Sequence, residues 1–404
     1  MSFTPTTVFA PDQFSLDSSS RVRVSQVTTL ADYKEVGFPR TLYFDVEGTG
    51  TYSTSGVDDN MCRLHVEPGQ YIVRQSKLWH SYHAGKSQFV ELTFDSFAPQ
   101  SGIRKLLGYY SSSPVAPYTA EYDGFWLLSS GTTNTISFVI RNQGNLIYSK
   151  PLSGWLGYEQ LKDYNWNNFT VVAFDFLWLG GAACRMWVKG PNGFIFADEY
   201  THAGTASGIF IHSPTQPVRF EISSTTGTGD LRMICSTVGT EGSINSFGVS
   251  RSVTTNTTGT TLPIVGFKYP LLSVRGSNQG HNVEVQLLTT HAWASVQTAA
   301  DQIYWTIEVN PELTEQLNFV SVSGSAIEYA QGNDTCTVSA DGTIMASGVL
   351  AYGQLLDVEG QGLIDNFLAW HGMSIKNVRD VHVFTVTPLI NPTTVLAGFS
   401  IKEF

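Results

Sequence analysis

The chain has 404 residues, of which 14% are charged, and it carries a formal net charge of −11 at pH 7. Binding to a nucleic-acid backbone needs clustered Lys and Arg, so this charge balance argues against nucleic acid as a partner. No run approaches the roughly 18 apolar residues of a membrane-spanning helix, and the first ten residues lack the basic start and apolar block of a secretory signal. We therefore expect neither a nucleic-acid nor a membrane partner.

Length and residue types indicate a β-rich protein of two to three domains, taking roughly 150 residues for each. Typical soluble domains have about 25% charged residues, and here Ser, Thr, Gly and Asn take much of that place. The cysteines are widely spaced and form no Cys-x-x-Cys pair, which favours buried thiols and synthesis in a reducing cytosol. They are Cys62, Cys184, Cys235 and Cys336.

Residues 1–100 form the first expected region, and they carry short strands. Apolar and polar residues alternate within 41–46, 62–66 and 89–94, which is the pattern of a half-buried strand. A brief helix is expected at 29–34, with a threonine as its cap.

Residues 101–242 form the second expected region, and the stretch 168–201 at its centre carries the strongest signal. Three aromatic and β-branched runs there, each followed by glycine, are typical of a β-meander. Val172, Phe174 and Phe176 share one face of the first run, and the opposite face is nearly as apolar. Such a strand is covered on both sides. Together with the neighbouring strands, the stretch predicts two packed antiparallel sheets of jelly-roll type.

Residues 243–404 form the third expected region, which is also β-rich and begins with a polar tract at 250–261. A convincing helix is expected at 363–371, where apolar residues recur at helical spacing. The predicted fold class is therefore all-β: an antiparallel jelly-roll sandwich, flanked by N- and C-terminal β-rich regions with few short helices.

Two short patterns resemble metal sites. His80 and His83 have a spacing that suits zinc on a helix, but their surroundings read as a strand, where the two side chains face opposite ways. Asp163, Asn165 and Asn167 imitate the start of a calcium loop, but the sixth position lacks the glycine that such a loop requires. We expect a polar turn there, and no metal or other cofactor.

A glycan-cleaving enzyme would need two carboxylates across a cleft. Glu121 and Asp123 are the candidate pair, but Trp126 stands where the jelly-roll glucanases have their catalytic partner. Glu221 is isolated on another strand, where it is most simply solvated or hydrogen-bonded. No nucleophile elbow and no nucleotide-binding loop occurs. We expect no enzymatic activity.

Aromatic side chains can bind sugar, because their rings stack on pyranose faces. Trp126 and Trp166 are the candidate glycan contacts, with Trp155, Tyr109 and Tyr110 as further aromatic residues. Packing in a β-rich core explains most aromatic residues equally well. Glycan binding at Trp126 or Trp166 is therefore the alternative hypothesis for function.

Several segments together resemble the virion structural proteins of tailed bacteriophages, which have an N-terminal β region, a jelly-roll middle and a β-rich C-terminal part. The segments occur in the order of that family over nearly the whole chain. They are Val-Arg-Gln-Ser at 73–76, Tyr-His-Ala-Gly-Lys-Ser-Gln at 82–88, Leu-Thr-Phe at 92–94, Trp-Leu-Gly-Gly at 178–181, Pro-Val-Arg-Phe-Glu-Ile at 217–222, Ile-Cys-Ser-Thr-Val at 234–238, Glu-Gly at 241–242, Pro-Leu-Leu-Ser-Val-Arg at 270–275 and Phe-Ser-Ile-Lys-Glu at 399–403.

The resemblance implies a component of the virion, made in the host cytoplasm, that decorates the capsid or forms part of a head fibre or tail. It brings no catalytic residues. Composition and resemblance together lead us to expect a homo-oligomer, such as a trimer, that contacts other virion proteins through its β-sandwich surfaces. A tail-associated protein that recognises host-surface glycan is the alternative.

Overall fold

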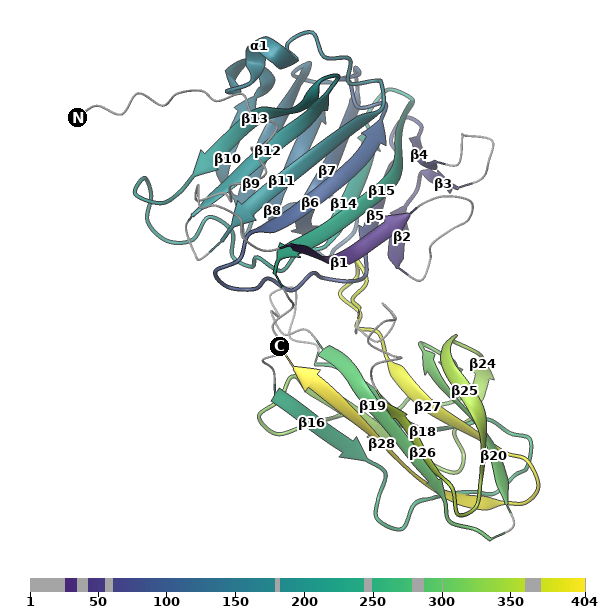
Figure 1. The fold of residues 1–404 in the computed structure, drawn as a ribbon. Helices are drawn as coiled ribbons and strands as arrows, with labels where there is room; N and C mark the ends of the chain where they lie inside the picture. Colours follow the sequence, from purple (N-terminus) through teal and green to yellow (C-terminus); the bar gives the residue numbers. More distant parts are fainter. Residues whose placement is uncertain are drawn as a thin grey trace. The chain divides into compact units, whose positions relative to one another are not determined.

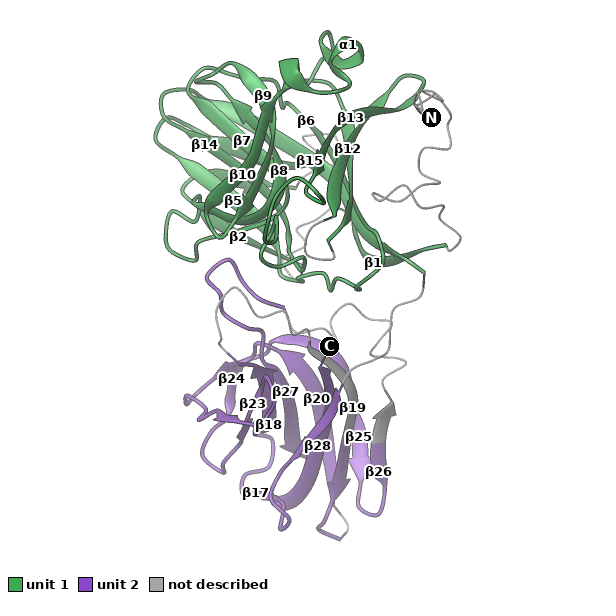
Figure 2. Cartoon of the chain, turned by 90° about the vertical axis from the view of Figure 1, so that its left-hand side faces the viewer, with its two compact units in different colours: residues 1–245 green, residues 246–404 purple. Residues whose placement is uncertain are grey.

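The computed structural model describes residues 26–34, 43–54, 61–178, 182–242, 249–277, 287–299, 301–359 and 372–403. The chain divides into two units, residues 1–245 and 246–404, each with its own packed core (Figure 2). Strands dominate both units, and every pairing among the described strands is antiparallel. The predicted all-β fold is confirmed.

Unit 1 is a sandwich of two large sheets (Figure 1). The eight-stranded sheet has the order β13 (Gly193–Thr201), β12 (Ala183–Gly190), β11 (Thr170–Leu177), β6 (Gln88–Asp95), β15 (Gly229–Glu241), β4 (Cys62–Val66) and β3 (Thr51–Ser53), with β1 (Val27–Lys34) also pairing with β15. The seven-stranded sheet has the order β10 (Asn145–Pro151), β9 (Thr135–Asn142), β8 (Glu121–Ser130), β7 (Ile103–Ser112), β14 (Val218–Ser224), β5 (Tyr71–Ser76) and β2 (Phe44–Gly48). Two short helical turns, η3 (Leu152–Gly154) and α1 (Tyr158–Leu161), follow β10.

Aromatic rings fill the space between the two sheets of unit 1. Phe125 of β8 lies 5.2 Å from Phe174 and 5.0 Å from Phe176, which are on β11 of the other sheet. Phe174 and Phe176 are two of the residues whose spacing of two predicted a shared face, and both are fully buried. Side chains of this size contribute about 1.5–3 kcal/mol each when they are buried, so this layer stabilises the sandwich.

Unit 2 is a smaller sandwich. Its six-stranded sheet has the order β22 (Val320–Ser321), β23 (Ile327–Gln331), β18 (Tyr269–Gly276), β27 (His382–Pro388), β20 (Gln302–Val309) and β25 (Thr343–Ala351). Its five-stranded sheet has the order β16 (Val249–Thr254), β28 (Thr393–Glu403), β19 (Leu287–Val296) and β26 (Leu355–Glu359), with β17 (Thr260–Leu262) also pairing with β28. A two-stranded ribbon joins β21 (Glu312–Leu313) and β24 (Val338–Ala340), and one core cluster contacts both large sheets.

The expected boundary at residue 100 does not separate compact units. Strands β5 and β6, from the first hundred residues, pair with β14 and β15, so they are integral to the two sheets of unit 1. The regions expected at 1–100 and 101–242 are therefore interleaved in one sandwich. The expected boundary between 242 and 243 lies three residues from the division between the two units.

The helix expected at 29–34 is a strand instead, β1. Ala31 and Tyr33 are buried while Asp32 and Lys34 are exposed, and this alternation fits a strand that pairs with β15. Tertiary pairing overrides the local cap signal there. The helix expected at 363–371 lies outside the described residues.

Candidate functional site

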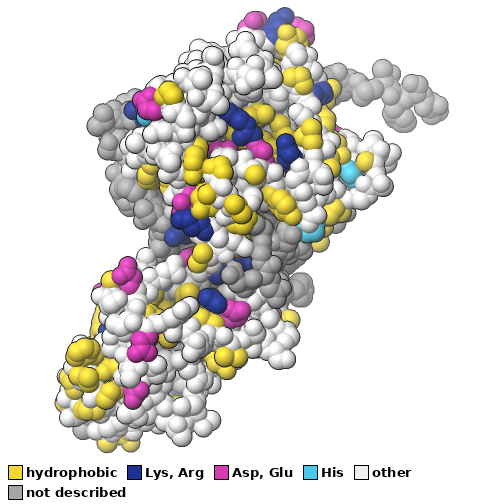
Figure 3. Space-filling model, turned by 180° about the vertical axis from the view of Figure 1, so that it is seen from behind, with side chains coloured by type: hydrophobic (Ala, Val, Ile, Leu, Met, Phe, Trp, Pro, Cys, Tyr) yellow, Lys and Arg dark blue, Asp and Glu magenta, His cyan; other side chains and the backbone are white. Residues whose placement is uncertain are grey.

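The seven-stranded sheet has a face directed away from the core, and we call it the outer face. On β7, Tyr109 lies 5.6 Å from Phe125 inside the sandwich, so its neighbour Tyr110 belongs to the outer face. On β8, Phe125 points inward, so Trp126 also belongs to the outer face. Figure 3, which views the molecule from the side of this sheet, shows hydrophobic and charged side chains gathered near the middle of unit 1.

Two fully buried charged residues of β14 lie on the outer face. Arg219 donates hydrogen bonds to Gln75 Oε1 at 2.8 Å and to the backbone oxygen of Tyr118, and it pairs with Glu221 at 3.3 Å. Tyr118 belongs to the loop that joins β7 and β8, so that loop lies over this part of the face. Burial raises the pKa of Glu221, and the neighbouring guanidinium groups oppose that effect.

Arg104 of β7 links this pair to a second carboxylate. One of its terminal nitrogens lies 3.2 Å from Glu221 Oε1, and the other contacts Glu121 of β8. The side chain of Arg104 is 36% exposed, whereas that of Glu121 is only 9% exposed. Arg104, Glu121, Arg219 and Glu221 form what we call the charged network. Arg104 is the member through which the network meets solvent.

A β-bulge places Glu121 on the outer face. Ser111 pairs with Asp123 but Ser112 pairs with Glu121, so Tyr122 is the extra residue of β8. Bulges of this kind re-aim side chains. The candidate catalytic pair, Glu121 and Asp123, is therefore split between the two faces of the sheet, and its spacing of two was misleading. Glu221, expected to be isolated, is the carboxylate that shares Arg104 with Glu121.

Asp123 points into the sandwich and has a structural function. Its carboxylate accepts hydrogen bonds from the backbone N–H groups of His212 and Ser213, both at 2.8 Å, and from Gln216 Nε2 at 2.9 Å. It thereby fixes the segment that leads from β13 into β14. Burial raises the pKa of Asp123 to about 6, although these hydrogen bonds act in the opposite direction.

Trp126 lies beside the charged network, but its ring is not available for stacking. The ring packs 4.8 Å from that of Tyr110 in a small cluster with Leu106 and Val139, and only 1% of the residue is exposed. Its indole Nε1 is buried without a hydrogen-bond partner. The expected role of Trp126 as a stacking surface for sugar is therefore corrected, because its ring is covered. The aromatic cluster packs against the charged side chains, and Arg219 lies over the ring of Tyr110.

Trp166 lies in a different aromatic cluster. Its ring is 5.0 Å from Tyr164, 6.1 Å from Trp155 and 6.5 Å from Phe97, and the residue is 4% exposed. These contacts attach the segment after α1 to the sandwich. The expected role of Trp166 as a glycan contact is corrected for the same reason as that of Trp126, since its ring is covered by other rings.

The two patterns that resemble metal sites form ordinary hydrogen bonds. His80 is buried between Tyr33 Oη and the backbone oxygen of Gln216, both at 3.0 Å, and burial lowers its pKa to about 4. Asn165 Oδ1 accepts from the backbone N–H of Asn167 at 3.1 Å, as in a polar turn. Within the described ranges, no group of three or more His, Cys, Asp or Glu residues is arranged to hold a metal ion.

No helix in the described ranges has the length and apolar character to cross a membrane.

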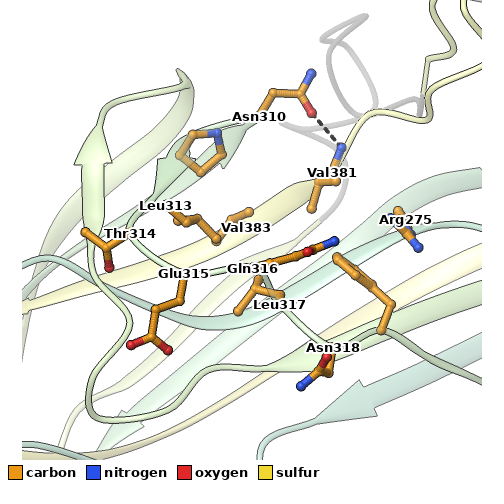
Figure 4. A pocket seen from close by; sticks show the side chains of 12 residues that line it. Arg275, Asn310, Leu313, Thr314, Glu315, Gln316, Leu317, Asn318, Val381 and Val383 are labelled. Carbon is orange, nitrogen blue, oxygen red and sulfur yellow. Dashed lines mark hydrogen bonds between the residues drawn. The ribbon is translucent and has the colours of Figure 1, made fainter.

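Unit 2 contains a pocket of about 670 Å³ beside β21, β18 and β27 (Figure 4). Asn310 on its wall donates to Asp380 and accepts from the backbone N–H of Val381. Arg275 lies 4.0 Å over the ring of Phe319 and pairs with a glutamate of β23. Asn310 and Arg275 are each already engaged with neighbouring residues, so the pocket indicates no particular class of ligand.

No protein-family model and no curated protein matches the chain. Among solved structures, it is similar to a legume lectin-like domain from Entamoeba histolytica, with 11% identity and a TM-score of 0.36 over 53% of this chain and 98% of that one. It is also similar to the luminal domain of VIP36 bound to Ca²⁺ and Man3GlcNAc, with 10% identity and a TM-score of 0.37 over 55% and 92%. A protein of unknown function from Shewanella oneidensis MR-1 has 12% identity and a TM-score of 0.37 over 61% and 100%. At these values the likeness does not extend to function.

Proposed function

We propose that the protein is a non-enzymatic binding component of a tailed-phage particle, and that the outer face of its seven-stranded sheet binds a host-surface glycan. The observation that carries the proposal is the charged network of Arg104, Glu121, Arg219 and Glu221. Burying a charged side chain costs several kcal/mol of hydration free energy. A group of such side chains on one face of a sheet therefore marks a candidate binding site.

The chemistry of the network suits a neutral sugar. Carboxylates accept hydrogen bonds from hydroxyl groups, and a guanidinium donates to hydroxyl oxygens in a fixed planar geometry. The network contains two positive and two negative side chains, so its formal charges cancel and it does not favour a strongly anionic ligand. Arg104 is held between Glu121 and Glu221, and its guanidinium faces solvent. Because the side chain is already ordered, binding a ligand costs it little conformational entropy.

The proposed place in a virion is supported by the resemblance and by where its segments lie. The segments at 73–76, 92–94, 217–222 and 234–238 fall on or beside β5, β6, β14 and β15, none of which is an edge strand. The third of these contains Arg219 and Glu221. Half of the charged network therefore lies within the resemblance, while Arg104 and Glu121 lie outside it.

A glycan array of bacterial surface polysaccharides, probed with the full chain with and without calcium, tests the binding function. We expect at least one neutral glycan to bind equally in both conditions. An array that stays blank in both would refute the proposal.

Gold-labelled antibody imaging of intact virions tests the place in the particle. Label at the tail tip or fibres supports glycan recognition on the host. Label spread over the head supports a second candidate function, capsid decoration or a head fibre, which is favoured by the exposed edge strand β25 of unit 2. Particles without label would contradict the virion assignment.

A further inference from the structure

Strand β25 (Thr343–Ala351) is an edge of unit 2 that carries no charge. It ends the six-stranded sheet, and among the described strands it pairs only with β20. Its nine residues include no charged side chain, and the whole stretch from Gly342 to Leu356 is uncharged. Ile344 is 45% exposed and Val349 60% exposed. A long, apolar, exposed edge is a ready template for pairing with another strand.

The other edge strands of five or more residues in the described ranges are protected by charge. Proteins commonly place charged side chains on such edges to prevent association. The protected edges are β1 with Asp32 and Lys34, β2 with Asp45 and Glu47, β10 with Lys150, β13 with Glu199 and β16 with Arg251, and the sequence of β26 contains Asp357 and Glu359. Because β25 alone among them lacks this protection, its edge is suited to a contact.

We propose that β25 pairs with β25 of a second copy of this chain, antiparallel and about a two-fold axis at Ser347. The pairing would join two six-stranded sheets into one continuous sheet and satisfy the outward backbone groups of both edges. This interface is independent of the glycan site in unit 1.

The sequence of β25 fits pairing with itself. About Ser347, Ala346 lies opposite Gly348, so small residues meet at the centre, and the exposed Val349 flanks them on each side. A two-fold axis brings identical residues close together, and any charge near the centre would be repelled by its own copy. The absence of charge from 342 to 356 is what such an axis requires.

Exposed apolar side chains beyond the strand extend the same surface. A turn after β25 leads to β26, the edge of the five-stranded sheet, and Tyr352 and Leu355 there are 51% and 67% exposed (Figure 2). Burial of such side chains adds to the strand pairing at about 25 cal/mol per Å² of apolar area. Edge pairing and apolar burial thus favour the same contact.

Sedimentation equilibrium of the full chain, with a mass of 44.3 kDa, tests the proposal with Val349→Lys. We expect a reversible dimer whose association constant falls at least tenfold in this variant, since two lysines would be brought close to the axis. Val320→Lys is the matched control, because Val320 is 58% exposed on β22, the opposite edge of the same sheet. It should associate as the unmodified chain does.

Cross-linking gives a second test that holds even if the lysine variant fails to fold. With Ser347→Cys, the two-fold axis places the new thiol opposite its own copy, within reach of a disulfide. We expect a covalent dimer under mild oxidation, and none with Val320→Cys. A chain that remains monomeric at all concentrations, a trimer, or a dimer that Val349→Lys does not weaken would each overturn the proposal.

Discussion

Replacing Asp123 by asparagine should change how the stability of unit 1 depends on pH. The carboxylate is buried, and its pKa is raised from 3.8 to about 6, chiefly because burial disfavours the charged form. A shift of about two pKa units corresponds to about 3 kcal/mol of differential stability. Between pH 4 and 6 the folded chain keeps a proton that the unfolded chain has lost. The contribution of Asp123 is therefore fully present below pH 4 and is lost as the pH rises to about 6.

Asp123→Asn has no charge to bury at any of these pH values. Its side chain keeps one acceptor for His212 or Ser213 but loses the other, so the variant should be less stable than the unmodified chain at pH 4. From pH 4 to pH 7 the difference in unfolding free energy should move by about 3 kcal/mol in favour of the variant.

Urea unfolding of the full chain at a series of pH values measures this difference. Hydrogen exchange at the backbone amides of His212 and Ser213 assigns it to the segment that Asp123 holds, because these amides donate to its carboxylate. Parallel pH profiles of the two proteins would refute the reasoning, since they would show that the carboxylate is not desolvated.

Three further substitutions test the packing of unit 1 by urea unfolding. Gly108→Ala would place a Cβ 2.6 Å from the backbone of Trp126 and should lower the unfolding free energy by about 1–3 kcal/mol or more. Gly69→Ala is the control: its Cβ meets nothing within 4 Å, and it should cost about 1 kcal/mol through its positive φ. Equal losses would contradict the close approach at Gly108. Trp166→Ala should cost about 3–5 kcal/mol yet leave glycan affinity unchanged, and a loss of affinity in the folded variant would place Trp166 in the site. Glu221→Gln should cost about 3–5 kcal/mol, because it leaves the buried guanidinium of Arg219 without its charged partner. A neutral effect would mean that the network is hydrated.

The layered β architecture could be predicted from sequence because its signal is local. Alternation along 170–177 gives both the strand and its two faces, and the structure buries Phe174 and Phe176 as that alternation requires. The helix expected at 29–34 is a strand because pairing with β15, two hundred residues away, decides its conformation. The expected boundary at residue 100 failed for the same reason, since sheet order depends on such distant pairings.

The candidate site could not be predicted from sequence. Arg104 and Glu221 meet across 117 positions of the chain, and no spacing rule joins them. Glu121 reaches the outer face only because of the bulge at Tyr122, and local sequence does not show on which side of Gly124 the register shifts. Trp126 was singled out because exposed tryptophans bind sugars, but sequence does not show which aromatic rings are covered.

The central claim, that the outer face binds glycan through the charged network, is tested most directly by the effect of Arg104→Ala on affinity. Isothermal titration calorimetry with the strongest ligand from the array gives the affinity, and Arg63→Ala is the matched control. Arg63 is an arginine of the other sheet with similar exposure, 34%, and it likewise pairs with a carboxylate, that of Asp230. A hydrogen bond to a charged group is worth about 1.5–3 kcal/mol, so Arg104→Ala should weaken binding at least tenfold while Arg63→Ala leaves it within about twofold. Equal affinity in both variants and the unmodified chain would contradict the account.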